Sequence, residues 1–201
     1  MSTNSEEKRK EKRDKILQEA ITLFSRNGYS QTTISDVAKA SDVSFGSVFT
    51  YFSSKENLFR AAVSEPLEKW GPLFFDVAEK DGTPLEKIQQ MVREQVKVFL
   101  REGPYLRLIQ YVLGQPDRFE EEVKNLDHFL DQFQVTLRPI IEQGQECGEL
   151  ERIDPNLVTL SYLSFINGIR LTLTDYFDYE NWELYVDQAL RLFGPIPKER
   201  R

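Results

Sequence analysis

Near the N-terminus the sequence predicts two short consecutive helices, and the few residues between them are enough only for a tight turn. Thr33 and Asp36 have the spacing of a capping box, in which the threonine hydroxyl accepts a hydrogen bond from a free helix N–H. Asp42 suits a left-handed turn position, and Ser44 can cap a second helix that runs to about Phe52. A capped helix, a turn and another capped helix predict a helix-turn-helix motif.

The elements on either side of this motif are also predicted to be helices. Apolar residues between Ile16 and Phe24 recur at the spacing of one helix face, and Gly28 is expected to end that helix. Ser53 and Glu56 have the spacing of another capping box, which predicts that a fourth helix begins there.

Charge is divided unevenly along the chain. The formal net charge is −7. Residues 1–60 hold 10 Lys and Arg against 8 Asp and Glu, a net +2, so residues 61–201 hold the remaining 16 against 25, a net −9. Part of the positive charge lies between Lys8 and Lys15, a run expected to be a solvated leader before the first helix. The total charge argues mildly against a nucleic-acid partner, but it hides a basic N-terminal part beside an acidic remainder of the chain.

The aromatic residues of the third predicted helix divide by face. Val48 and Phe52 are four residues apart and are expected to pack inward. Phe45 and Phe49 can present apolar edges to thymine methyl groups, and Tyr51 keeps a hydroxyl for a phosphate. The alternative is that these side chains form only a small core, which we favour for Phe52 but not for Phe45 or Tyr51.

The segment "ILQEAITLFSRNGYSQTTISDVAKASDVSFGSVFTYFSSKENLF", residues 16–59, resembles the tetracycline-repressor (TetR) family of bacterial regulators. The resemblance covers under a quarter of the chain. It implies an all-α homodimer with a helix-turn-helix DNA-binding domain, residues 1–60, and a helical domain, residues 61–201, that binds an effector and dimerises. It also implies a double-stranded DNA operator as partner. The DNA contacts that it implies are Thr33, Ser44, Phe45, Gly46, Ser47, Phe49, Thr50, Tyr51 and Lys55.

Three positions depart from the family pattern. Asp42 replaces a frequent glycine, Phe45 stands where a basic residue is common, and Phe49 stands where tyrosine is common. The turn should survive the first change, but two polar contacts with DNA are lost, so the bases that are read stay open.

Helical periodicity continues beyond residue 60. Pro66, Gly71 and Pro72 either interrupt the fourth helix or kink it. Further helices are expected from Pro84 to about Phe99, from Tyr105 to Leu113, over a long segment ending at Gly144 or Gly148 and bent around Pro139, from Pro155 to about Phe177, and from Asn181 to Phe193.

Two amides, Gln95 and Asn167, are expected among apolar neighbours inside this second domain. A buried amide needs hydrogen-bond partners, whether protein, water or ligand. For Asn167 a helix–helix hydrogen bond is nearly as good an interpretation, whereas Gln95 favours a pocket for a small, largely apolar organic effector. The predicted apolar wall of that pocket is Trp70, Phe74, Phe99, Tyr105, Tyr111, Phe129 and Phe133.

A stripe of small side chains runs along the helix that follows Pro155. Small side chains let a second helix approach closely. Gly168 could make room for a neighbour in the same chain, but the resemblance to the TetR family implies a two-fold four-helix dimer interface here. The predicted interface residues are Ser161, Ser164, Gly168 and Thr172, with Trp182, Tyr185 and Ala189 of the last helix.

The sequence offers little to an enzyme. One histidine, His128, and one cysteine, Cys147, cannot supply the usual metal or nucleophile motifs, and no metal or cofactor is expected. His128 is expected at the surface, and Cys147 is expected to be an unexceptional thiol. Glu120 to Glu122 are expected to be a solvated charge run and not a catalytic pair.

No signal peptide or apolar run of about 20 residues is present, which predicts a cytoplasmic protein with no membrane partner. We expect a ligand-responsive repressor; the alternative is an architectural DNA-binding dimer without an effector.

Overall fold

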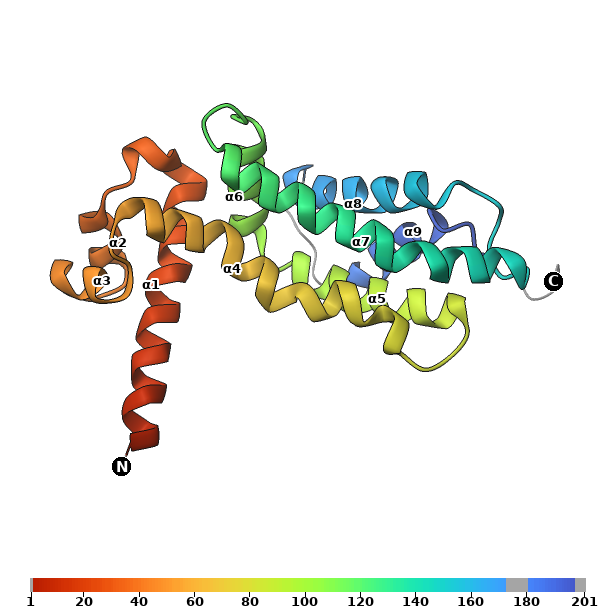
Figure 1. The fold of residues 1–201 in the computed structure, drawn as a ribbon, viewed down its shortest axis with the longest axis horizontal. Coiled ribbons are helices and arrows are strands. Elements are labelled where there is room, and N and C mark those ends of the chain that lie inside the picture. The colour runs from red at the N-terminus through yellow and green to blue at the C-terminus, as the bar shows by residue number, and fades with distance from the viewer. Residues whose placement is uncertain (1, 173–180, 198–201) are drawn as a thin grey trace. The chain divides into compact units, whose positions relative to one another are not determined.

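The protein is all-α, as predicted (Figure 1). The structure is a computed structural model that describes residues 2–172 and 181–197, with side chains described from 6 to 169 and from 181 to 197. In those ranges the only β interaction is an isolated bridge between Leu150 and Pro195. The helices are α1 (Ser2–Gln31), α2 (Ile34–Ala40), α3 (Phe45–Tyr51), α4 (Lys55–Phe75), the 3-10 helix η1 (Asp76–Glu79), α5 (Pro84–Phe99), α6 (Gly103–Leu113), α7 (Glu120–Glu146), α8 (Pro155–Thr172) and α9 (Trp182–Arg191).

The helices form two compact units. The first combines Met1–Glu68 with Arg107–Asn125, and the second combines Lys69–Leu106 with Leu126–Arg201. Helices α4, α6 and α7 therefore each supply residues to both units. The division of function near residue 60 stays a prediction. The first compact unit extends past that residue, and the separate segment Arg107–Asn125 completes it.

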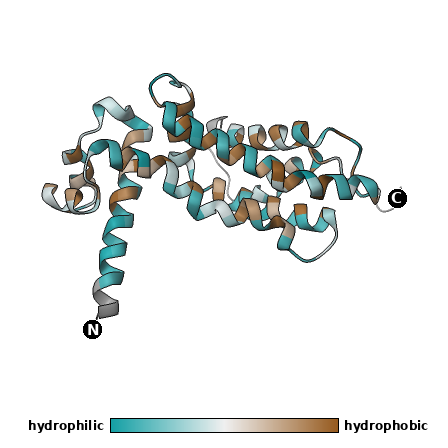
Figure 2. Ribbon diagram, in the orientation of Figure 1, coloured by the Kyte–Doolittle hydropathy of each residue, from teal (hydrophilic) through white to brown (hydrophobic). Residues whose placement is uncertain are grey.

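Helix α1 begins well before the position expected from the sequence. The charged run from Lys8 to Lys15 is helical, so the prediction of a leader outside the first helix was wrong. Figure 2 shows these turns as hydrophilic, with apolar residues appearing only further along α1. Gly28 has φ +74° and ψ 171°, which breaks the helical backbone before α1 ends at Gln31. The expected interruption at this glycine is therefore confirmed.

Residues 107–125 close the first unit over the end of α1. The Tyr29 N–H donates a hydrogen bond to the Tyr111 hydroxyl at 2.9 Å, and a Cβ added to Gly28 would lie 2.9 Å from the Tyr111 ring. Tyr111 thus packs in this unit, and its assignment to the effector pocket of the other domain was wrong. The ring centroids of Phe119 and Phe59 are 4.9 Å apart, which adds an aromatic contact to the same closure.

The acidic start of α7 also contributes to this closure. Arg60 pairs with Glu121 at 2.8 Å and with Glu122 at 3.6 Å. Glu122 is only 8% exposed, so the expectation that all three glutamates are solvated was wrong at this position.

The second unit is built around α5, and the buried residues of this helix are Leu85, Ile88, Met91, Val92, Gln95, Val96 and Phe99. Thr83 caps this helix in a capping box with Glu86, and the Glu149 carboxylate accepts a further hydrogen bond from the Leu85 N–H at 3.0 Å. Helix α9 packs along α5, and α8 contacts both. The core of the second unit therefore forms where α8 and α9 pack on the amphipathic helix α5.

The structure settles the course of α4, which the sequence left open, and moves the predicted start of α6. Helix α4 continues through Pro66, Gly71 and Pro72 as one helix, so these residues do not end it. Helix α6 begins at Gly103, two residues earlier than predicted. Over residues 2–172 and 181–197, none of the helices is both long and apolar enough to cross a bilayer.

Candidate nucleic-acid interface and effector domain

The capping box predicted at α2 is present in both halves. The Asp36 N–H donates to the Thr33 hydroxyl at 3.1 Å, and the Thr33 N–H donates to the Asp36 carboxylate at 2.8 Å. Hydrogen bonds from the Thr33 hydroxyl and N–H lower the pKa of Asp36, so the box is intact at neutral pH. Thr33 is exposed but its hydroxyl is already engaged in capping.

The turn between α2 and α3 follows the predicted chemistry. Asp42 has φ +57°, the left-handed conformation that aspartate tolerates better than most residues. Ser44 then caps α3, because its side-chain oxygen accepts a hydrogen bond from the Ser47 N–H at 3.2 Å. The two serine hydroxyls lie 2.7 Å apart, which fixes both side chains at the start of α3.

The cap of α4 lies one residue later than predicted. The Asn57 N–H donates to the Ser54 side-chain oxygen at 3.1 Å, and the Leu58 N–H donates to the Ser54 carbonyl at 3.0 Å. Ser54, and not Ser53, is thus the capping residue. Adjacent serines made the two registers indistinguishable by residue type alone.

Helix α3 turns two aromatic side chains outward. Val48 is fully buried and Phe52 is 4% exposed, which confirms that these two pack inward. Phe45 is 54% exposed and Phe49 is 41% exposed, and their ring centroids lie 5.2 Å apart in an edge-to-face pair. Because two neighbouring phenylalanine rings leave about half of their surface in water, this pair indicates a contact surface.

The other predicted DNA contacts are accessible too. Ser44, Gly46 and Thr50 are exposed, and Ser47, Tyr51 and Lys55 are partly exposed. The Lys55 ammonium lies 4.4 Å from the centroid of the Tyr29 ring, which holds the cation close to the start of α4. All nine predicted residues are therefore at least partly exposed, although the Thr33 hydroxyl is used in capping, and their roles stay predictions.

Gly46 provides a test that separates folding from DNA contact. A Cβ added at Gly46 would have no neighbour within 4 Å, so the Gly46→Ala variant should fold normally and gain up to about 1 kcal/mol of helix propensity. If Gly46 allows close approach to DNA, the same methyl group should weaken DNA binding about tenfold or more, roughly 1.4 kcal/mol. Urea unfolding and a fluorescence binding titration measure the two effects. Unchanged DNA affinity would contradict the contact.

Aromatic side chains predicted to line the effector pocket come together in the second unit. The Phe74 ring centroid lies 5.7 Å from that of Phe99, 4.9 Å from that of Phe129 and 5.0 Å from that of Phe133. Trp70 adds edge-to-face contacts with Phe99 at 5.7 Å and with Tyr105 at 4.9 Å. We call Trp70, Phe74, Phe99, Tyr105, Phe129 and Phe133 the aromatic cluster. Its rings pack against one another.

Gln95 is fully buried in this unit and uses both ends of its amide. Its N–H group donates to the Leu73 carbonyl at 2.8 Å, and its oxygen accepts from the Tyr162 hydroxyl at 2.6 Å. Burial raises the pKa of Tyr162 well above its usual value, so the hydroxyl keeps its proton. Helices α4, α5 and α8 are thereby tied together. Asn167, by contrast, is only partly buried.

Removing Gln95 should reveal how much this network stabilises the fold. Gln95→Leu leaves the Leu73 carbonyl and the Tyr162 hydroxyl without this partner, which should lower the free energy of unfolding by about 1–3 kcal/mol. Adding Tyr162→Phe should cost less than the sum of the single changes, because it removes the unpaired hydroxyl. Chemical denaturation of the two single variants and the double variant gives the coupling. Additive losses would show that the two side chains are not coupled.

The predicted dimer residues do not all lie at a surface. Ser164 is exposed, and among the described residues no atom lies within 4 Å of a Cβ added to Gly168. Ser161, Trp182 and Tyr185 are partly exposed. Ala189 is fully buried in its own chain, so its assignment to the dimer surface was wrong, and the side chain of Thr172 lies outside the described residues.

Sequence reasoning missed three exposed leucines near this stripe. Leu157 and Leu160 of α8 are 58% and 43% exposed, and Leu184 of α9 is 60% exposed. Leu157, Leu160, Ser164 and Gly168 follow one another at spacings of three and four, which places them on one face of α8. The signal was present in the sequence as leucines beside the small residues.

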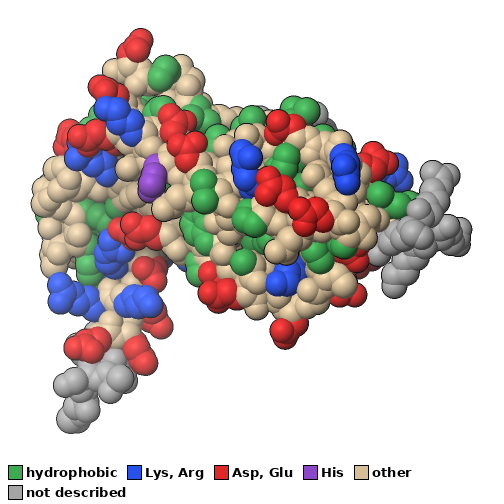
Figure 3. Space-filling view, turned by 45° about the vertical axis from the view of Figure 1, so that its right-hand side comes forward, with side chains coloured by type: hydrophobic (Ala, Val, Ile, Leu, Met, Phe, Trp, Pro, Cys, Tyr) green, Lys and Arg blue, Asp and Glu red, His purple; other side chains and the backbone are tan. Residues whose placement is uncertain are grey.

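The single histidine and cysteine lie apart from these features. His128 is exposed, as predicted, and Figure 3 shows a histidine at the surface. Cys147 is exposed too. Within the described residues there is no group of three or more His, Cys, Asp and Glu side chains placed to hold a metal ion.

Known proteins match the two parts of the chain separately. Residues 16–62 match the family model described as bacterial regulatory proteins of the tetR family. Residues 81–171 match the model of a tetracyclin repressor-like C-terminal domain. The chain belongs to the TetR family. The residues that suggested this resemblance lie within the first match, and TetR-family proteins are DNA-binding transcriptional regulators.

A curated relative covers most of this TetR-family chain. The biofilm operon icaADBC HTH-type negative transcriptional regulator IcaR of Staphylococcus epidermidis is 26% identical over 166 residues, which are 82% of each protein.

Solved structures share the TetR-family fold at lower identity. The fatty acid degradation regulator FadR from Bacillus halodurans is 19% identical with a TM-score of 0.70, over 94% of this chain and 97% of that one. AibR in complex with isovaleryl coenzyme A and operator DNA is 16% identical with a TM-score of 0.68, over 92% of this chain and 100% of that one.

Proposed function

We propose that the protein is a repressor that binds a palindromic operator as a homodimer and leaves it when a small, largely apolar organic effector binds. The relative IcaR is named as a negative regulator, which favours repression over activation. The observation that carries the proposal is the outward-facing Phe45–Phe49 pair on α3, which has no role in the core of its own unit.

The operator is proposed to be read by α3 in the major groove. A thymine methyl group is the only apolar feature among the base edges of that groove, so exposed phenylalanine rings suit thymine better than any polar edge. The sequence FGSVFTY of α3 has no charged side chain. Affinity must then come from phosphate contacts elsewhere, and sequence preference from apolar contact and shape.

The homodimer is proposed to form along α8 and α9. Leu157, Leu160 and Leu184 present apolar area that a single chain leaves in water, and Gly168 leaves room for a second helix. A two-fold dimer would repeat the same surface on both subunits and present two copies of α3 to the DNA.

The effector is proposed to enter the aromatic cluster beside Gln95. The amide can still offer one N–H and one lone pair after its contacts with Leu73 and Tyr162. Solved relatives of the same fold include AibR with an acyl coenzyme A and the fatty acid degradation regulator FadR, which makes an acyl chain the first effector to test. If effector binding lowers operator affinity 100-fold, the coupling free energy between the effector site and the DNA-binding site is about 2.7 kcal/mol.

Selection from random double-stranded DNA, followed by footprinting, tests the operator. The proposal predicts a two-fold symmetric site with thymines in each half, protected over half-sites about 34–36 Å apart or a multiple of that spacing. Adding isovaleryl coenzyme A or a long-chain acyl coenzyme A should then remove the footprint. Failure to enrich any sequence would contradict operator recognition, and a footprint that no apolar compound changes would favour the architectural alternative.

A further inference from the structure

The first turns of α1 form a helix without a core of their own. Every residue from Glu6 to Lys15 is charged, six of them basic and four acidic, and the buried apolar positions of α1 begin only at Ile16. In Figure 1 these turns project beyond α2 and α3, and Figure 3 shows both signs of charge over them. A helix that is polar all round gains little from packing, so its purpose must lie in its charges.

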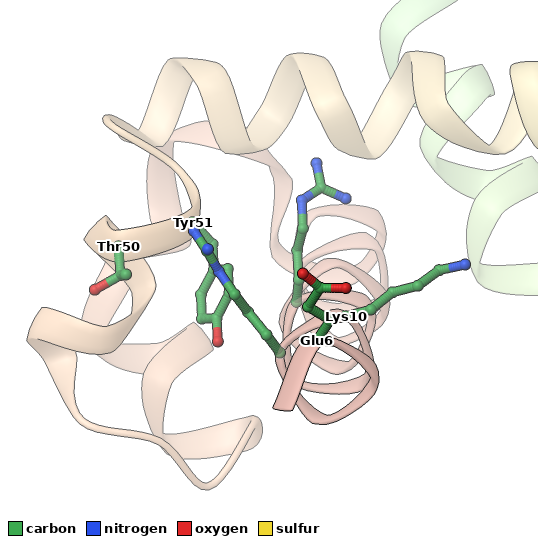
Figure 4. A pocket seen from close by; sticks show the side chains of 6 residues that line it. Glu6, Lys10, Thr50 and Tyr51 are labelled. Atoms are coloured by element: carbon green, nitrogen blue, oxygen red, sulfur yellow. The ribbon is translucent and has the colours of Figure 1, made fainter. Parts of the chain in front are cut away.

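These turns form one wall of a groove, and the end of the reading helix α3 forms the other. The groove has a volume of about 340 Å³. Figure 4 shows Tyr51 extending from α3 toward α1, Glu6 on the facing side, and the side chains of Lys10 and Thr50 reaching outward to either side. The groove is lined by Glu6, Arg9, Lys10, Arg13, Thr50 and Tyr51.

The cations of the groove are not equally available. Arg13 donates two hydrogen bonds to Glu65, at 2.7 and 2.5 Å, and its guanidinium lies 4.8 Å from the centroid of the Phe52 ring. That pairing neutralises its charge and fixes it as part of the wall. Arg9 and Lys10 are exposed, and neither joins any ion pair found among the described side chains. Glu6 is the single acidic residue among those that line the groove, so Arg9 and Lys10 leave it with a net positive charge.

We propose that this groove binds a phosphate of the DNA backbone next to the bases that α3 reads. Arg9 and Lys10 would supply the charge, with the guanidinium of Arg9 able to bind two phosphate oxygens at once, and the Tyr51 hydroxyl would donate a further hydrogen bond. DNA is the occupant because one wall of the groove is the end of the helix already proposed to enter the major groove. The inference therefore rests on DNA binding by α3 and adds a second, sequence-independent contact to it.

The salt dependence of DNA binding tests the groove. Arg9→Ala with Lys10→Ala removes its two free cations, whereas Lys8→Ala with Lys12→Ala removes two exposed cations that do not line the groove. Both variants lose the same charge on the same helix, and alanine favours the helix in each. Binding is measured from 50 to 200 mM salt on a 40-base-pair random-sequence duplex and on the selected operator.

The groove variant should lower the slope of log affinity against log salt by about 1 per protomer on both DNAs, because one phosphate contact is lost, and the control variant by clearly less. A neutral methylphosphonate at one flanking backbone position should weaken the unaltered protein but not the groove variant. Equal slopes for the two variants, or an unchanged slope for the groove variant, would overturn the inference while leaving operator recognition by α3 intact. If the unaltered protein bound neither DNA, the proposed function itself would fail.

Discussion

Gly168→Leu should convert the protein into a folded monomer that binds its operator at least about 100-fold more weakly. Among the residues that the structure describes, a Cβ at this position would meet no atom within 4 Å, so we expect the unit that contains it to accept a side chain there. Between two subunits, the leucine side chain should hold the paired α8 helices apart. Loss of the second half-site removes an avidity that commonly reaches 10²–10⁴-fold. Sedimentation velocity measures the association state, and a binding titration measures the affinity.

Gly168→Ala is the matched control for this prediction. A methyl group is small enough to be accepted between closely packed helices, and alanine raises helix propensity by up to about 1 kcal/mol, so this variant should remain dimeric. If the leucine variant also sedimented as a dimer, the interface would have to lie on another face of the molecule.

Phe45→Ala should reduce operator affinity by roughly 1–3 kcal/mol, about 5- to 150-fold, and should do so selectively. Phe45 is 54% exposed, so its removal costs the fold little. The loss should be confined to operators that carry thymine at the contacted position. Replacing that thymine by uracil removes only the methyl group, and should weaken the unaltered protein while leaving the Phe45→Ala variant unaffected.

Uracil at a position outside both half-sites serves as the control DNA for this experiment. Affinities of the two proteins for the thymine and uracil operators form a double-mutant cycle between one ring and one methyl group. An equal loss for Phe45→Ala on every DNA sequence would refute base reading by this side chain.

Local signals in the sequence predicted the helix-turn-helix well. The Thr33–Asp36 capping box, the Ser44 cap and the left-handed Asp42 each depend on residues within a few positions, and the structure has all three. The buried face of α5 could also be predicted, because helical periodicity identifies the apolar face of a helix without any knowledge of the helices that cover it.

Errors arose where distant residues decide the environment. Tyr111 pairs with Tyr29, 82 positions away, and so joins the DNA-binding unit in place of the effector pocket. Glu122 is buried beside Arg60, and Ala189 is buried on α9, which packs along α5. Periodicity gives the face of a helix but not the partner that covers it, so such assignments need the structure.

Helix α1 illustrates a different limit. A run of ten consecutive charged residues has no apolar stripe, and a pattern method based on hydrophobic spacing therefore starts the helix at Ile16. Because these charged residues are helical, Arg9 lies beside the end of α3, and the two helices together form the groove. No motif in the sequence indicated this groove.

Transcription in vitro from a promoter that contains the selected operator tests the central claim most directly. Purified polymerase is incubated with the protein alone and with the protein plus isovaleryl coenzyme A or a long-chain acyl coenzyme A, and the full-length transcript is quantified. A repressor released by an apolar effector predicts that the protein lowers the transcript and that an effector restores it, with no restoration when the operator is scrambled. A transcript that the protein leaves unchanged or raises would contradict the account.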